Sequence, residues 1–165
     1  MIAIKISKQK EFMSKLLTTD LFDSFPLEEA TVDTYNTFHI DGKVHKEFYK
    51  GYEDVDPGSL EDFSLWRDIR HIALDLIKGK RTPLSFKFVL HADKELKNTV
   101  MQGCDSDLSP EVTLLGIIIK FSKGEVVITT GTSFSIFSMD KSIEKAWDAY
   151  IPSFLDRSGI DYELL

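Results

Sequence analysis

Strand-like alternation of apolar and polar positions is densest in the second half of the chain. Residues 112–121 form an isoleucine-rich run, residues 125–130 resume the pattern, and residues 132–139 repeat it. Gly124 and Gly131 stand between these runs, where a turn needs a residue that accepts positive φ. The pattern predicts a three-stranded antiparallel meander.

A second strand pattern lies in the first half of the chain. Residues 27–34 and 35–40 are rich in Thr, Val, Tyr and Phe. Asp41 and Gly42 both accept positive φ, so they predict a hairpin turn before a further strand at residues 43–49. Together these segments predict a second meander.

Helical spacing of apolar residues separates and follows the strands. The predicted helices run from a Ser7 cap to residues 18–20, over residues 64–78 with Gly79 at the C′ position, over residues 92–102 with Asp93 as the cap, and from an Asp140 cap to Ile151, where Pro152 kinks or ends the helix. Strands are also predicted at residues 2–6 and 84–90. Residues 51–62 are acidic and predict an exposed loop, and residues 156–165 predict a loosely held tail.

The predicted elements follow the same order in both halves, namely strand, helix, three strands and helix. Ile4 aligns with Phe88 and Leu16 with Val100, at an offset of 84 positions in both cases. The sequence therefore predicts one α+β domain over residues 1–165. It would be an internal duplication of a β-α-β-β-β-α unit, with pseudo-repeats at residues 1–79 and 84–155 and two antiparallel meanders packed against helices.

The excess of acidic side chains limits the kinds of partner that the chain can bind. Its 165 residues carry 27 acidic and 20 basic side chains, a formal charge of -7, which opposes indiscriminate attraction to DNA or anionic membranes. Cys104 is the single cysteine, and the N-terminal segment lacks the apolar core of a signal peptide. No apolar run approaches the roughly 20 residues that span a bilayer. We expect a cytoplasmic chain without membrane contact.

Candidate chemistry at the cysteine and the neighbouring acids is weak. Cys104 precedes Asp105 and Asp107, which would raise rather than lower a thiol pKa, so we expect no nucleophile there. Asp105, Asp107, Ser109 and Glu111 alternate oxygen atoms as a calcium loop does, but they lack its central glycine and distal glutamate. Solvated loop acids are the favoured interpretation.

The histidines give no local support for a metal site. They are His39, His45, His71 and His91. They fall on separate predicted elements, and none is paired with a second histidine four residues away. The sequence therefore predicts no catalytic residue, no cofactor and no metal ligand.

The repeated unit, and the run LLGIIIKFSKGEVVITTGTSFSIFS at residues 114–138 in particular, resembles the repeating unit of DNA sliding clamps. Clamps build each domain from two such units and carry two or three domains per chain. The resemblance therefore implies that several copies of this chain would have to self-associate to encircle DNA. The long helices predicted at residues 64–78 and after Asp140 have no counterpart in the clamp unit.

In clamps the corresponding short helices face the duplex and touch phosphates without reading sequence. The resemblance implies weak, non-specific DNA contact through five lysines, namely Lys8, Lys10, Lys15, Lys94 and Lys97. Glu11, Asp93 and Glu95 share these helices and dilute the positive field, so a solvated helix face is the alternative interpretation.

The chain as a whole also resembles a small bacterial family of unassigned function, especially in LFDSFPLEEA, SLWRDIR and DLIKGKRTPLSFKFVLH. That resemblance implies no activity. Two hypotheses follow from the sequence. The first is a non-enzymatic binding or scaffold protein with a clamp-like architecture, of the kind that accompanies nucleic acid. The alternative is a small cytoplasmic enzyme or ligand-binding protein whose site no linear motif reveals.

Overall fold

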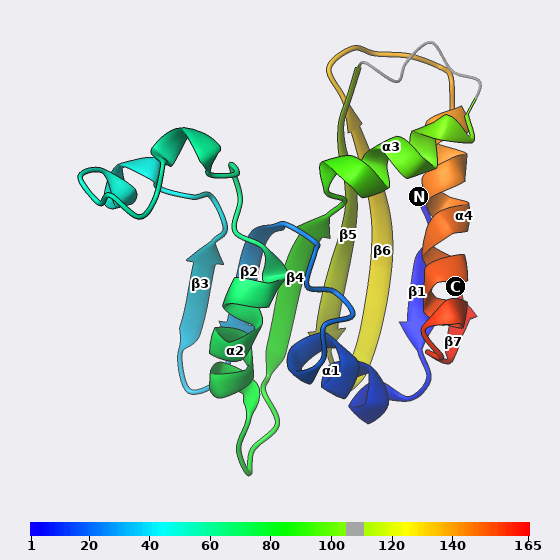
Figure 1. The fold of residues 1–165 in the computed structure, drawn as a ribbon. Helices are drawn as coiled ribbons and strands as arrows, with labels where there is room; N and C mark the ends of the chain where they lie inside the picture. The colour runs from blue at the N-terminus through cyan, green and yellow to red at the C-terminus, as the bar shows by residue number, and fades with distance from the viewer. Residues whose placement is uncertain (105–110) are drawn as a thin grey trace.

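The architecture is one layer of antiparallel strands with helices packed on one side (Figure 1). The computed structural model describes residues 1–104 and 111–165. In this part of the chain the strands form one sheet with the order β3-β2-β4-β5-β6-β1-β7. The strands are β1 (Ala3–Ile6), β2 (Leu27–Asp33), β3 (Thr37–Asp41), β4 (Ser85–His91), β5 (Val112–Ser122), β6 (Glu125–Phe134) and β7 (Tyr162–Leu164).

Helices contribute the second layer of the molecule. The α-helices of the described chain are α1 (Gln9–Thr18), α2 (Trp66–Ile77), α3 (Lys94–Gln102) and α4 (Ser142–Arg157), and the 3-10 helices are η1 (Lys46–Tyr49) and η2 (Pro57–Ser59). The expected caps of α3 are present, because the Asp93 side chain accepts a hydrogen bond from the Leu96 amide and Gly103 follows the last turn. The predicted α+β fold class is confirmed.

The alternation of side chains gives the sheet two different faces. In β4, Phe86, Phe88 and Leu90 point toward the helices and are buried. Lys87 and Val89 point to the opposite face, which no helix of the described chain covers. The core therefore lies on one side of the sheet, between the strands and the four α-helices.

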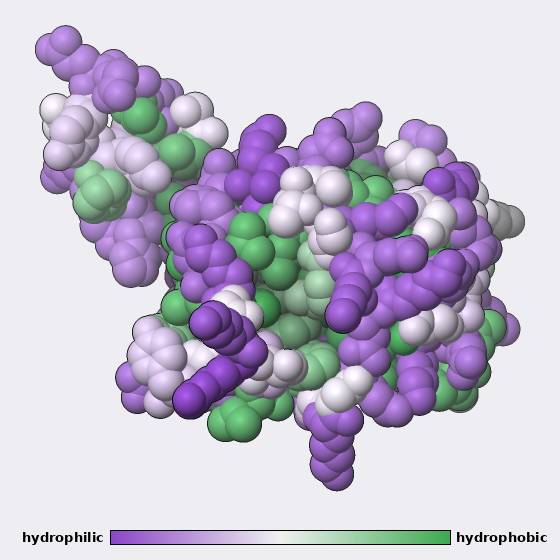
Figure 2. All heavy atoms as spheres, turned by 90° about the horizontal axis from the view of Figure 1, so that it is seen from below, coloured by the Kyte–Doolittle hydropathy of each residue, from purple (hydrophilic) through white to green (hydrophobic). Residues whose placement is uncertain are grey.

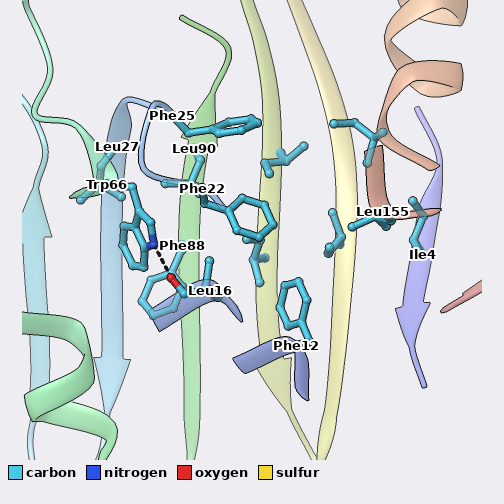
Figure 3. Packing of buried hydrophobic residues seen from close by; sticks show 14 of the residues in the cluster. Ile4, Phe12, Leu16, Phe22, Phe25, Leu27, Trp66, Phe88, Leu90 and Leu155 are labelled. Atoms are coloured by element: carbon cyan, nitrogen blue, oxygen red, sulfur yellow. Dashed lines mark hydrogen bonds between the residues drawn. The ribbon is translucent and has the colours of Figure 1, made fainter. Parts of the chain in front are cut away.

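Two buried tryptophans tie helices to this core, and Figure 3 shows one of them, Trp66. Trp66 of α2 lies 5.0 Å from Phe88 of β4, measured between ring centroids, and its Nε1 donates a 2.8 Å hydrogen bond to the Leu16 carbonyl oxygen of α1. Trp147 of α4 donates from its Nε1 to the Gly116 carbonyl oxygen of β5 at 2.9 Å. Each ring is buried without leaving its polar atom unpaired.

Residues 112–139 form two strands rather than the predicted three. The β5–β6 turn is at Lys123 and Gly124; Gly124 has the positive φ that the sequence indicated, and Lys123 has positive φ as well. Gly131 makes no turn, because it lies inside β6 directly opposite Gly116 of β5. The sequence pattern misassigned Gly131 because a glycine inside a strand and a glycine at a turn look alike until the partner strand is known.

The predicted meander in the first half is also wrong. β2 and β3 form a hairpin, but the chain turns at residues 34–36 rather than at Asp41 and Gly42. Gly42 is needed for another reason, since a Cβ there would lie 1.8 Å from the Leu27 carbonyl oxygen. Residues 43–49 form connecting chain and η1 instead of a strand. The glycine therefore permits close backbone approach and does not supply a turn.

Residues 43–62 leave the sheet beyond β3 and project as an arm (Figure 1). The base of the arm is closed by a 2.8 Å hydrogen bond from the Val44 amide to the Asp62 carbonyl oxygen. Every residue of the arm is exposed or half-exposed, in line with the exposed loop expected at residues 51–62. The arm has no hydrophobic core of its own.

The C-terminal segment is built into the sheet and is not a loose tail. α4 continues through Pro152 to Arg157, and β7 then pairs with β1. A proline inside a helix costs about 3 kcal/mol. Ile151 and Leu155 are buried on either side of Pro152, and each gains about 1.5–3 kcal/mol from burial, so packing keeps the helix intact.

The order β-α-β-β-α occurs twice along the chain, in β1-α1-β2-β3-α2 and in β4-α3-β5-β6-α4. The sheet does not give these halves equivalent positions. β4 lies next to β5 of its own half, whereas β1 lies away from β2, between β6 and β7. The internal duplication is therefore not confirmed, and each half has two strands after its first helix instead of three.

Candidate functional site

A polar cleft of about 840 Å³ lies where β4 leads into α3. We define it by its lining residues within the segments 20–26, 61–67 and 91–97, together with Thr113. Backbone hydrogen bonds hold these segments together: the Leu27 amide donates to the Ser64 carbonyl oxygen at 2.8 Å and the His91 amide to the Pro26 carbonyl oxygen at 3.0 Å. The cleft is thus formed by segments that are far apart in the sequence.

Several carboxylates of the polar cleft are engaged in holding the fold. Asp93 accepts from the Leu96 amide at 2.8 Å and caps α3. Asp23 accepts from Arg70 Nε at 2.8 Å, and Asp62 accepts from Lys46 Nζ at 3.0 Å. The hydrogen bond from Lys46 lowers the pKa of Asp62, which is therefore ionised at neutral pH. These groups position the walls of the cleft.

Two cations of the polar cleft have a different role. Arg67 and Lys94 are exposed, and neither side chain has an ion-pair or hydrogen-bond partner in the described part of the chain. Lys97 differs from them, because its Nζ donates to the Val112 carbonyl oxygen at 2.9 Å. Arg67 and Lys94 are therefore not tied to a partner by an ion pair, although Lys94 lies near enough to Asp62 to help lower the pKa of that carboxyl.

His91 forms part of the cleft wall. Its Nδ1 lies 3.4 Å from the Ala92 carbonyl oxygen, and its ring meets Phe63 edge-on with centroids 5.1 Å apart. Nε2 is enclosed and has no hydrogen-bond partner among the described residues. Burial lowers the pKa of His91, so the ring is neutral at neutral pH. When Nδ1 donates to Ala92, Nε2 is left as an acceptor.

The structure does not gather the five lysines of the sequence prediction into one surface. Lys8, Lys10 and Lys15 belong to the segment around α1, at the lower end of Figure 1, whereas α3 with Lys94 and Lys97 lies at the upper end. Three of the five bond to this chain itself. Lys8 pairs with Asp161 at 2.8 Å, and that hydrogen bond raises the pKa of Lys8; Lys15 donates to the Ser158 carbonyl oxygen, and Lys97 to Val112.

A second hollow, of about 280 Å³, lies at the opposite end of the molecule from the polar cleft. We call it the lower hollow. Its lining is mostly apolar and consists of Gln9, Met13, Ser14, Leu17, Leu74, Ile77, Lys78, Thr82, Pro83, Phe86, Phe121 and Val126. Figure 2 looks at this end and shows apolar side chains recessed between polar ones. The stacked rings of Phe86 and Phe121, with centroids 5.2 Å apart, lie at its sheet side.

The structure also bears on the cysteine and on the possible metal ligands considered from the sequence. Cys104 is half-buried with Sγ 3.5 Å from the Val100 carbonyl oxygen, and burial raises its thiol pKa, which disfavours the nucleophilic thiolate. Asp105, Asp107 and Ser109 lie outside the described residues. Across the described ranges, no group of three or more His, Cys, Asp or Glu side chains is placed to hold a metal ion.

Comparison with known families gives a match over residues 15–163 to a family of unknown function, DUF5721. The chain belongs to this family. Neither the curated proteins nor the solved structures contain a match to the chain. The resemblance to DNA sliding clamps therefore has no support from known structures. Within the described part of this DUF5721 chain, every helix is too short or too polar to cross a membrane.

The sequence prediction missed the polar cleft because its parts are distant in the chain. Arg67 begins a helix, His91 ends a strand and Lys94 follows a cap, and no spacing relates them. One signal was present. Asp93 marked the start of α3 directly after β4, and a strand that runs into a helix through a short connection often borders a ligand site.

Proposed function

We propose that this DUF5721 chain is a non-enzymatic binding protein that holds a small polar ligand with an anionic group in the polar cleft. The observation that carries the proposal is the pair of cations Arg67 and Lys94. Both line the cleft, and neither has a partner among the described residues. Guanidinium and ammonium groups that face a cleft and have no carboxylate of their own are suited to bind carboxylate or phosphate.

Binding is favoured over catalysis by the state of three carboxylates and of the histidine, while Asp20 and Glu61 are left to contact a ligand. Asp23, Asp62 and Asp93 are engaged by Arg70, by Lys46 and by the start of α3. A general acid or base needs a free proton-transfer atom within reach of a substrate. His91 Nε2 is enclosed beneath the cleft surface, so a ligand in the cleft does not reach it without movement of the wall.

The size and the mixed charge of the cleft restrict the ligand. A volume of about 840 Å³ falls in the range of small-molecule sites, about 300–1,000 Å³. Arg67 and Lys94 suit an anionic group, while Asp20 and Glu61, which also line the cleft, suit hydrogen-bond donors. A zwitterion such as an amino acid, with a carboxylate and an ammonium group, matches both. A polyanion would be repelled by the acids.

Thermal unfolding with defined probes tests the proposal. We expect glutamate, glycine or succinate to raise the melting temperature by mass action, and glucose to leave it unchanged. Arg67→Gln and Lys94→Gln should each reduce that shift. Arg81→Gln is the matched control, because Arg81 is an exposed cation outside the cleft. A shift that Arg81→Gln reduces equally, or no shift with any anionic probe, would contradict the proposal.

DNA contact by the lysines of α1 and α3 is a separate and weaker candidate. Lys10 and Lys94 are exposed without partners in the described chain, but they belong to different ends of the molecule. Binding to phosphates grows with the number of cations that reach one duplex. The separation of these lysines therefore favours the ligand site over a nucleic-acid surface.

A further inference from the structure

The arm at residues 43–62 presents aromatic side chains that nothing in the described chain covers. Phe48 and Tyr52 are 72% and 63% exposed, in a segment where no residue is buried. The arm nevertheless has a defined local structure. Phe48 packs edge-on against Tyr49 with ring centroids 5.4 Å apart, and the Asp56 side chain caps η2 by accepting from the Gly58 amide at 3.0 Å. Exposed aromatics on such a segment mark an interaction surface.

The net negative charge of the arm indicates which kind of surface could bind it. Residues 43–62 contain six carboxylates and three lysines. Glu47 is next to Phe48, and Glu53 and Asp54 follow Tyr52, so the aromatic rings are flanked by negative charge. A complementary surface therefore has an apolar recess with cations around it.

The lower hollow has these two properties. Its volume of about 280 Å³ exceeds that of an engineered apolar cavity of about 150 Å³ that binds benzene, so it has room for a phenylalanine ring. Lys78 is part of its lining, and Lys80 and Arg81 are exposed in the loop that follows. Lys10 is exposed beside Gln9 on the α1 side.

Acidic groups near the lower hollow do not cancel these cations. Asp75 pairs with Lys78 at 2.7 Å, and both side chains are 64% exposed. Glu11 is adjacent to Lys10 in the chain. Two further cations, Lys80 and Arg81, remain for an acidic partner, with no ion pair of their own among the described residues.

An arm cannot reach the hollow of its own chain. The arm leaves the sheet at the upper end of β3, while the hollow opens at the lower end, where the loop before β4 and the start of α1 lie (Figures 1 and 2). We propose that the arm of one copy docks in the lower hollow of a second copy, with Phe48 in the apolar recess and the acids of the arm against Lys80 and Arg81. This inference is independent of the ligand proposed for the polar cleft.

The geometry of this contact sets the form of the assembly. Donor and acceptor surfaces are different and lie at opposite ends, so the contact is head-to-tail, and a dimer still has a free hollow on one copy and a free arm on the other. Association should therefore continue beyond the dimer, to a ring or a short chain. One arm supplies about 20 residues, the lower limit for a standard interface, so the assembly should be reversible and should weaken with salt.

Sedimentation velocity of the full chain from micromolar to millimolar concentration tests the proposal. We expect the wild type to form species larger than a dimer as the concentration rises. Phe48→Ala should weaken association by about tenfold or more, as expected for an aromatic anchor. Tyr35→Ala is the matched control, because Tyr35 is 82% exposed but belongs to the β2–β3 turn. Association that Tyr35→Ala weakens as much as Phe48→Ala would overturn the assignment.

A mixing experiment separates this contact from other kinds of association. Ser14→Phe places a ring at the mouth of the lower hollow from an exposed position on α1, and Ser153→Phe on exposed α4 is its control. Phe48→Ala retains an intact hollow, and Ser14→Phe retains an intact arm. We expect each variant alone to be monomeric and an equimolar mixture to give a one-to-one dimer and nothing larger. A monomeric wild type overturns the proposal, and it is the result expected if a small apolar molecule occupies the hollow. Association that survives Ser14→Phe also overturns it, because the copies would then meet through another surface.

Discussion

Trp66 Nε1 donates a 2.8 Å hydrogen bond to the Leu16 carbonyl oxygen, across 50 positions of the sequence (Figure 3). Leu16 belongs to the last turn of α1, where carbonyl groups have no partner inside the helix. The Thr18 and Thr19 hydroxyls likewise donate hydrogen bonds to the two preceding carbonyl oxygens, of Ser14 and Lys15. The end of α1 is therefore closed by side chains, one of which comes from α2.

Replacing Trp66 with Phe should keep an aromatic ring in the core but leave the Leu16 oxygen buried and unpaired. The expected loss in the free energy of unfolding is about 2–3 kcal/mol, from the unsatisfied acceptor and a small cavity. Urea denaturation with an unchanged m value measures it. Trp147→Phe should give a similar loss through the Gly116 oxygen. A loss within about 0.5 kcal/mol, the range of surface substitutions, would contradict the role given to this bond.

Gly42 and Gly131 form a matched pair for testing why a glycine is present. A Cβ at Gly42 would lie 1.8 Å from the Leu27 carbonyl oxygen, whereas a Cβ at Gly131 would meet nothing within 4 Å. We expect Gly42→Ala to destabilise the fold by about 3 kcal/mol or more, since backbone must move. Gly131→Ala should be close to neutral, because its φ is compatible with alanine. Equal losses in thermal or urea unfolding would contradict this distinction.

His91 should make stability depend on pH. Burial lowers its pKa in the folded state, so the unfolded chain binds more protons below the ordinary value of about 6.5. The free energy of unfolding should therefore be constant with respect to this group above that pH and should fall as the pH is lowered through the window beneath it. Glu28 acts against the shift and Lys97 supports it.

Two histidine variants isolate that contribution in urea unfolding between pH 5 and pH 8, the range in which histidine titrates. His91→Leu should flatten the pH slope, and His71→Leu, at an exposed position of α2, should leave it as in the wild type. An unchanged slope in His91→Leu would show that other groups carry the acid sensitivity.

Nucleic-acid binding by the lysines of α1 and α3 is testable by gel shift over a range of salt. Because Lys8, Lys15 and Lys97 bond to groups of this chain, we expect binding that is weak and is lost steeply as salt rises. The double variant Lys10→Glu/Lys94→Glu changes the lysines without partners in the described chain, and Lys145→Glu on α4 is the control. Tight, salt-sensitive binding that the double variant abolishes and Lys145→Glu preserves would restore the clamp hypothesis.

The sequence predicted what depends on neighbours in the chain. The positive φ of Gly124, the Asp93 cap and the helix at residues 64–78, found as Trp66–Ile77, all follow from local chemistry. Features that depend on distant partners were missed. Gly131 was assigned to a turn because Gly116 opposite it could not be seen, and residues 156–165 were assigned to a tail because their pairing with β1 leaves no periodic pattern.

The candidate site could not be predicted from the sequence either, because it too depends on partners that are distant in the chain. A lysine stands out in an acidic sequence whether or not it has a partner, and the partners of Lys8 and Lys97 are Asp161 and the Val112 oxygen, which no spacing connects to them. Arg67 shows the converse. Its sequence neighbours do not reveal that it lines a cleft and makes no ion pair among the described residues.

The position of β1 also governs when this protein can fold. Ala3 pairs with Thr129 of β6 and Ile4 with Leu164 of β7, so β1 cannot complete its pairing until residues far later in the sequence are in place. Until then the apolar side chains of Ile4 and Ile6 have no sheet to pack into, and transiently exposed apolar segments of this kind are prone to aggregate. We therefore expect slow folding for a chain of this length, since these strand pairings join residues that are far apart in the sequence.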